Sequence, residues 1–221
     1  MADRWATFDC YGTLIDWNAG ILRELERLFG VRDAPRLLER YHELEPEVQA
    51  GSFRSYREVL TLTLERLGAE ERLSIPEGEA DALAKSLPSW EPFAEVPAAL
   101  EELRHRGWTL AILSNSDRDL IAASRERIGV PFDRSIVAED VNSYKPSHGH
   151  WEEFFARTDA DRSRHVHVAA SLFHDVAPAT ELGLRSVWIN RLGENAGRHK
   201  PTQELPDLAS LPQTLEELVP A

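Results

Sequence analysis

Residues 4–17 read RWATFDCYGTLIDW, and this stretch decides the expected fold. Its first part, RWATFD, has the aromatic and β-branched composition of a strand, and Gly12 permits a close turn directly after it. Later runs of the same kind are each followed by a turn signal and a helical pattern. They lie at residues 108–113, 134–139, 165–171 and 185–190. This alternation predicts an α/β fold with a doubly wound parallel sheet and helices on both faces.

Residues 10–107 separate the first two expected strands, which is far too long for a single crossover. Helical periodicity fills most of this stretch, in residues 19–30, 35–49, 56–68 and 77–87. The proline-rich segment PSWEPFAEVP at residues 88–97 then ends the helical pattern. We therefore expect residues 16–88 to form a helical cap, inserted into a Rossmann-like core made of residues 1–15 and 89–221. The segment LPQTLEEL at residues 211–218 predicts a short closing helix.

The composition excludes several classes of protein. With 42% hydrophobic and 29% charged residues, the chain is expected to be soluble and globular. Its formal net charge of −13 disfavours a nucleic-acid partner, because nucleic-acid affinity depends largely on a basic surface. We expect no membrane association, since there is neither a signal-peptide pattern nor a run of roughly 18 apolar residues. Cys10 is the single cysteine, which excludes an intramolecular disulfide and makes a cytoplasmic location the default expectation.

Polar residues follow four of the expected strands. Asp9 ends the first strand, Ser114 and Asn115 follow the second, Lys145 lies after the third, and Asp175 lies after the fourth. Taken singly, such residues are also explained as turn residues, helix caps or a solvated lysine. Ligands of open parallel sheets bind beyond the carboxyl ends of the strands. Two acids, a hydroxyl with an amide and a cation, in this order, therefore indicate one shared site.

Four segments carry a family resemblance that covers essentially the whole chain. FDCYGTLIDW, LSNS, SYKPS and the HD of SLFHD resemble the ordered motifs of the haloacid dehalogenase superfamily, and the inserted helices match its α-helical cap subclass. Phosphatases of that superfamily have a second aspartate two residues after the first, which protonates the leaving alcohol, but here Tyr11 occupies that place. A halide leaves without a proton. The FDxYGTL form is similar to the L-2-haloacid dehalogenase branch, which implies hydrolytic dehalogenation of short 2-haloacids.

The resemblance implies a role for each of the residues at the strand ends. Asp9 would attack the substrate carbon with inversion and form an aspartyl ester, which water then hydrolyses. Lys145 would keep Asp9 ionised, and Asp175 would orient the water. Ser114 and Asn115 would bind the substrate carboxylate, with Asn115 also contacting the halide.

The resemblance also nominates residues that bind the substrate or halide. Arg40, within RYHELE, matches the cap arginine of the branch in spacing, with a solvated helix residue as the alternative. Tyr56 falls where the branch has an aromatic pocket wall, and ordinary helix packing explains it equally well. Trp151 stands where the branch has a tyrosine. The complete set expected to bind substrate or halide is Tyr11, Arg40, Tyr56, Asn115, Trp151 and Ser171.

The fourth motif departs from the branch because its asparagine is missing and Ser171 or Leu172 takes its place. His148, His150 and His174 lie nearby, as candidate bases or ligands or as locally packed residues.

The HVH pattern at residues 165–167 places two histidines on one face of a strand. We predict that both are sheet residues rather than ligands.

Three functions remain open. The first is a dehalogenase that needs no cofactor or metal and binds a small anionic substrate. The second is a hydrolase of another small carboxylic or phosphate substrate. A phosphatase would use magnesium bound by Asp9 and Asp175, and would need a different proton donor such as His174. The third is a non-catalytic binding protein of the same fold. Related proteins are often dimers through the cap, so a homodimer is possible.

Overall fold

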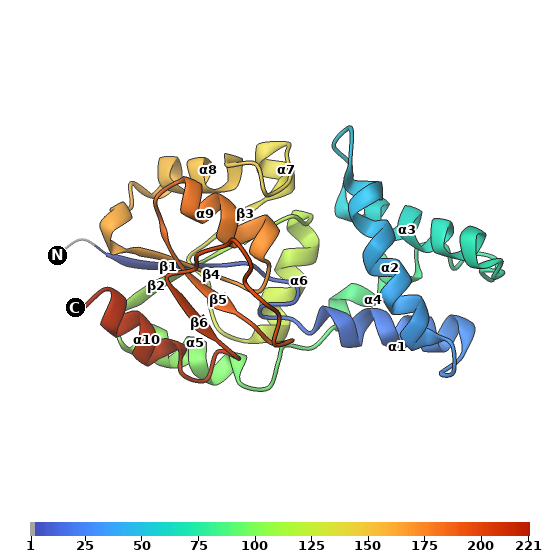
Figure 1. Cartoon of the computed structure of the whole chain (residues 1–221), viewed down its shortest axis with the longest axis horizontal. Helices are drawn as coiled ribbons and strands as arrows, with labels where there is room; N and C mark the ends of the chain where they lie inside the picture. The colour runs from blue at the N-terminus through green and yellow to red at the C-terminus, as the bar shows by residue number, and fades with distance from the viewer. Residues whose placement is uncertain (1–2) are drawn as a thin grey trace.

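The computed structural model describes residues 3–221 and contains a six-stranded parallel sheet (Figure 1). The strands lie in the order β3-β2-β1-β4-β5-β6. Their bounds are β1 Arg4–Phe8, β2 Trp108–Ser114, β3 Arg134–Val137, β4 His165–Ala169, β5 Arg185–Ile189 and β6 Gln203–Leu205. From β1 the chain proceeds to one edge through β2 and β3, and then crosses back to β4 on the other side. The predicted doubly wound α/β fold is confirmed, and the order reverses beside β1, where such sheets bind ligands.

The strands differ from the prediction at the edges of the sheet. Strand β3 ends at Val137, because Ala138–Val141 turn into the short helix α7. Strand β6 was not predicted from the sequence. It is three residues long and exposed or half-exposed on the sheet edge, so the residue pattern carries no burial signal there.

Helices cover both faces of the sheet in the core lobe. In Figure 1, α7, α8 and α9 lie on one side, and α5 and α10 lie on the other. The bounds of the core helices are α5 Val96–His105, α6 Arg118–Ile128, α7 Ala138–Val141, α8 Gly149–Thr158, α9 Ala177–Glu181 and α10 Leu211–Leu218. Three short turns of helix are η1 Leu87–Ser89, η2 Arg162–Arg164 and η3 Leu172–Val176. The predicted closing helix is confirmed as α10.

The inserted residues form a separate helical lobe at one end of the molecule (Figure 1). Its helices are α1 Trp17–Phe29, α2 Ala34–Gln49, α3 Tyr56–Glu71 and α4 Ala82–Ser86. Helix α1 begins earlier than predicted because the Asp16 side chain accepts a hydrogen bond from the Ala19 backbone N–H and caps it there. Helix α4 is shorter than predicted, since the segment before it turns through Gly78 at φ +79°.

The two lobes are joined where the chain leaves the core and returns to it. Isolated bridges pair Ile15 with Tyr11 and with Pro92. Gly20 of α1 packs so closely on Trp90 that a Cβ at this position would lie 2.4 Å from the indole ring. One apolar core runs through both lobes. The boundaries at residues 16 and 88 stay a prediction. In residues 3–221, no helix is long and apolar enough to cross a membrane.

Candidate active site

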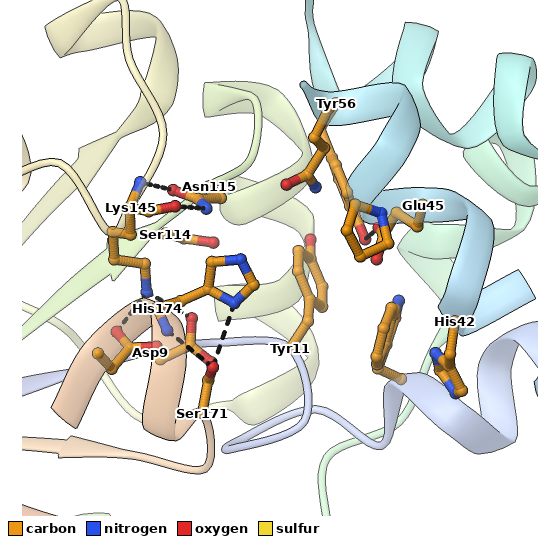
Figure 2. A pocket seen from close by; sticks show the side chains of 14 residues that line it. Asp9, Tyr11, His42, Glu45, Tyr56, Ser114, Asn115, Lys145, Ser171 and His174 are labelled. Atoms are coloured by element: carbon orange, nitrogen blue, oxygen red, sulfur yellow. Dashed lines mark hydrogen bonds and ion pairs between the residues drawn. The ribbon is translucent and has the colours of Figure 1, made fainter. Parts of the chain in front are cut away.

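A cavity of about 280 Å³ lies between the carboxyl ends of the strands and the cap (Figure 2). Figure 2 shows Tyr11 in view between His174 on the core side and Glu45 on the cap side. The core side is lined by Asp9, Tyr11, Ser114, Asn115, Lys145, Ser171, His174 and Asp175. The cap side is lined by Trp17, His42, Glu45, Pro46, Gln49 and Tyr56. The four residues predicted to be catalytic therefore line one cavity.

Lys145 lies between the two acids at the floor of the cavity. Its Nζ is 2.8 Å from Asp9 Oδ1, 2.6 Å from Asp175 Oδ1 and 2.9 Å from the Leu113 carbonyl oxygen. The side chain is buried, so all three ammonium protons are donated to protein oxygens. Burial by itself lowers the pKa of Lys145, but Asp175 and Asp9 outweigh this effect and raise it. The lysine is therefore a permanent cation in the site.

The two acids have different surroundings. Burial raises the pKa of Asp9, and the Lys145 ammonium opposes this change. The Thr13 hydroxyl donates to Asp9 Oδ2 over 2.9 Å and accepts from the Ala170 backbone N–H, which fixes Asp9 toward the cavity. Burial would also raise the pKa of Asp175, but the charge of Lys145 lowers it well below its usual range. Asp175 is therefore ionised at neutral pH.

Asn115 holds the loop that carries Lys145. Its Nδ2 donates to the Lys145 carbonyl oxygen over 3.0 Å, and its Oδ1 accepts from the Lys145 backbone N–H over 2.6 Å. This pairing leaves one amide proton of Asn115 for a ligand. Ser114 ends β2, and its carbonyl oxygen is 3.0 Å from Nε2 of the buried His150. Burial lowers the pKa of His150 to about 4, so this residue is a neutral packing partner rather than a base.

Tyr11 and Tyr56 form an aromatic wall across the cavity. Their rings are stacked at 5.7 Å between centroids, and Trp90 meets Tyr11 edge-on at 6.0 Å. The Tyr11 hydroxyl is hydrogen-bonded to Ser124 Oγ over 3.1 Å. Burial raises the pKa of Tyr11 well above its usual value, so the phenol stays protonated and engaged. The residue two places after Asp9 therefore supplies a phenol hydrogen-bonded to Ser124 in place of a carboxylic acid.

Arg40 does not reach the cavity, which corrects the prediction for this residue. It forms ion pairs with Glu43 and Glu70 on the cap surface. The pocket-facing residues of α2 include His42 and Glu45. Arg40 precedes His42 by two residues, which is about 200° around an α-helix, so it projects from the opposite face. Among the described residues, no arginine lines this cavity.

Trp151 is also displaced from its predicted place. Its side chain is fully buried in the core and packs against His167, with ring centroids 5.2 Å apart, instead of lining the cavity. His148 lies on the surface, with Nε2 3.0 Å from Glu181. The third candidate histidine, His174, does line the cavity.

Ser171 and His174 form a local hydrogen-bonded pair at the N-terminal end of η3. The Ser171 Oγ accepts from the His174 backbone N–H over 3.0 Å and lies 3.1 Å from the His174 Nδ1. Burial lowers the pKa of His174, so its ring is neutral at neutral pH. Both residues line the cavity.

Several residues of the site were not predicted from the sequence. Four lie on the cavity face of α2, namely His42, Glu45, Pro46 and Gln49. The Tyr56 hydroxyl donates to Glu45 Oε1 over 3.2 Å, and burial raises the pKa of Glu45 to about 7. Another is His167, predicted only as a sheet residue, whose Nε2 lies 2.9 Å from Asp175 Oδ1. Helical spacing indicates that residues 42, 45, 46 and 49 share one face of α2, but it does not show that this face meets the core.

The described part of the chain contains no group of three or more His, Cys, Asp or Glu side chains arranged to hold a metal ion.

Comparison with known proteins identifies the family. The family model for haloacid dehalogenase-like hydrolases matches residues 4–183. The chain belongs to this family. A (S)-2-haloacid dehalogenase of Pseudomonas sp. (strain YL) is 30% identical to this hydrolase over 195 residues, which cover 84% of the chain and 82% of the relative. The (S)-2-haloacid dehalogenase 4A of Burkholderia cepacia is 26% identical over 222 residues, which cover 98% of the chain and 94% of the relative. These relatives confirm the resemblance to the L-2-haloacid dehalogenase branch.

A solved structure agrees on the fold of this haloacid dehalogenase-like hydrolase. The crystal structure of the L-2-haloacid dehalogenase RSc1362 superposes with a TM-score of 0.87. It covers 98% of this chain and 100% of that one, at 21% identity. The match extends over both the sheet and the cap, so the insertion of helices after β1 is part of the shared architecture.

Proposed function

We propose that this hydrolase cleaves the carbon–halogen bond of short 2-haloacids and releases halide and a 2-hydroxy acid. One observation carries the proposal. The Asp9 carboxylate is held by Lys145 and Thr13 at the cavity floor, while Tyr11, with its hydroxyl engaged by Ser124, stands where a leaving alcohol would need an acid. A nucleophile without a carboxylic acid two residues further along the chain suits a leaving group that departs as a stable anion.

In the first step, an oxygen of Asp9 attacks C2 of the substrate in line with the carbon–halogen bond. The halide leaves with the bonding electrons, the configuration at C2 inverts, and an ester joins Asp9 to C2 of the substrate. In the second step, water attacks the ester carbonyl carbon, Cγ of Asp9. Asp175 accepts the proton of the water, and the carbon–oxygen bond to the 2-hydroxy acid breaks. The product oxygen takes that proton, and Asp9 releases the second proton of the water to solvent, which restores its carboxylate.

The core side of the cavity supplies the groups that hold an anionic substrate. Ser114 and the remaining amide proton of Asn115 are proposed to bind the carboxylate, close to the Lys145 ammonium. Tyr11 and Tyr56 pack against the apolar part of the substrate. We propose no metal requirement, because the proposed substrate carries a single carboxylate charge rather than a phosphate group. Buried Cys10 carries a free thiol, which fits the cytoplasm as the proposed location.

Halide release tests the proposal directly. Purified protein is incubated with L-2-chloropropionate, chloroacetate and fluoroacetate, with magnesium or with a chelator, and released halide is measured. We expect chelator-insensitive release that Asp9→Asn abolishes. Magnesium-dependent phosphate release from a generic phosphate ester, with no halide release, would overturn the proposal in favour of a phosphatase.

The ester intermediate has a separate test. A single turnover in heavy-oxygen water is expected to place the label in the Asp9 carboxylate, which peptide mass spectrometry detects. An unlabelled Asp9 with a labelled product would show direct attack of water on the substrate.

A further inference from the structure

A chain of buried hydrogen bonds runs from Asp175 into the interior of the sheet. Asp175 Oδ1 lies 2.9 Å from His167 Nε2, and His167 Nδ1 lies 2.8 Å from Thr7 Oγ1. Thr7 Oγ1 is in turn 2.8 Å from His165 Nε2. Thr7 and His167 are partners in the register between β1 and β4, so the sheet itself fixes their separation. All four side chains are buried.

Counting donors and acceptors determines the position of one proton in this series of hydrogen bonds. Lys145 donates to Asp175 Oδ1, and an ionised carboxylate is an acceptor only. His167 Nε2 must therefore carry a proton and donate it to the same oxygen. The imidazole ring is held in place by Thr7 at its other nitrogen and by Trp151, whose ring packs at 5.2 Å. Asp175 Oδ1 thus accepts two hydrogen bonds, one from Lys145 and one from His167.

The second oxygen of Asp175 is left without a protein partner. Asp175 Oδ2 is buried and accepts no hydrogen bond from the described residues, although Asp175 lines the cavity. A buried carboxylate oxygen without a donor is costly unless water or a ligand supplies one. A single donor such as Lys145 leaves the carboxylate free to rotate about its Cβ–Cγ bond, whereas a second donor to the same oxygen restricts this rotation.

We propose that His167 is a positioning residue for the second half of the reaction. By donating to Oδ1, it fixes the Asp175 carboxylate so that Oδ2 is the oxygen that accepts the proton of the hydrolytic water. This inference rests on the proposed function, because it concerns hydrolysis of the Asp9 ester. It assigns His167 no contact with the substrate and no part in the displacement of halide.

Replacement of His167 is expected to separate the two half-reactions. In His167→Leu, the first turnover still releases about one halide per protein, while steady-state release falls about 10- to 100-fold, the range that one hydrogen bond to a charged group represents. The Asp9 ester then accumulates and appears as an added mass on the intact protein. In His167→Gln, the side-chain amide can donate to Asp175, so turnover is expected to recover to within about fivefold of the natural protein.

His165→Leu is the matched control, because it removes a buried histidine from the same face of β4 without removing a donor to Asp175. We expect no ester to accumulate in this variant, and thermal unfolding of both leucine variants monitors the fold. Equal losses in the two leucine variants without accumulated ester, or a His167→Gln variant as slow as His167→Leu, would overturn the inference.

A second measurement requires no turnover and keeps the inference separate from the proposed function. Nitrogen-15 NMR of the free protein is expected to show a proton on His167 Nε2, with a shift that changes in Asp175→Asn. An unprotonated Nε2 would overturn the inference even if the protein releases halide. If the natural protein releases no halide, the proposed function fails, and the NMR result then decides whether His167 orients Asp175.

Discussion

Asp117 of the core caps a helix of the other lobe, by accepting the backbone N–H of Tyr56 over 2.6 Å. Its second oxygen accepts the backbone N–H of Arg57 over 3.0 Å. Asp117 is also the N-cap residue of α6, but its side chain makes no capping bond there. The first N–H groups of α3 have no partner within that helix, so the buried acid satisfies them and holds Tyr56 over the cavity.

Asp117→Ala is therefore expected to loosen the cap. The buried N–H of Tyr56 and the part-buried N–H of Arg57 lose their acceptor, which should lower the free energy of unfolding by about 2 kcal/mol and raise KM through a displaced Tyr56. Thermal unfolding, KM and hydrogen exchange in the first turn of α3 provide the measurements. Asp119→Ala removes an exposed acid that pairs with Arg57 and should change little. Equal effects of the two substitutions would contradict the role of Asp117.

Glu45 should make substrate binding depend on pH. Burial raises the pKa of Glu45 to about 7, so its side chain is neutral below that pH and negatively charged above it. For an anionic substrate, kcat/KM should fall by about 10-fold as pH rises from 6 to 8, because a like charge appears in a poorly solvated cavity. Glu45→Gln should remove this fall. A pH profile that is the same in Glu45→Gln would show that another group is responsible.

The same residue should couple stability to pH. The pKa of Glu45 is about 7 in the folded chain and near its ordinary value of 4.5 when unfolded, so the folded state binds the extra proton between these values. Its contribution is most favourable below pH 4.5 and is lost as pH rises through 7, which costs about 3 kcal/mol. Glu45→Gln should therefore gain stability relative to the natural protein at pH 8. Denaturant unfolding of both proteins at pH 5 and pH 8 measures this difference, and a constant difference would refute it.

Arg40→Ala should leave substrate binding nearly unchanged. The side chain pairs with Glu43 and Glu70 on the cap surface, and exposed ion pairs contribute little. We expect KM for L-2-chloropropionate to change by less than about twofold, as is usual for surface substitutions away from a site. Glu43→Ala removes one partner of Arg40 and serves as the control. A large increase in KM with Arg40→Ala alone would mean that Arg40 reaches the substrate during turnover.

The residue pattern was sufficient for the core of the molecule. Asp9, Ser114, Lys145 and Asp175 could be assigned to one place because each follows a strand, and parallel strands present their carboxyl ends at one edge of the sheet. This relationship depends only on recognising the strands and their common direction. It holds whatever the packing of the cap.

The residues on the cap side of the cavity could not be predicted in the same way. Helical periodicity shows which residues of α2 share a face, but not which face meets the core. The position of Arg40 in RYHELE matched the family spacing, yet docking of α2 turned His42 and Glu45 toward the cavity. Strand β6 was missed for a related reason, because an exposed edge strand has no buried face to mark it.

Local periodicity and chain direction were sufficient to predict the α/β core, the inserted helices and the acids and lysine at the strand ends. The orientation of α2 and the contact between His167 and Asp175 are set only in the folded molecule. Both depend on how surfaces distant in the chain pack together: Asp117 satisfies the N–H groups of α3, and β1 and β4 set the register of Thr7 and His167. Such pairings arise from three-dimensional packing and have no signature in the order of residues.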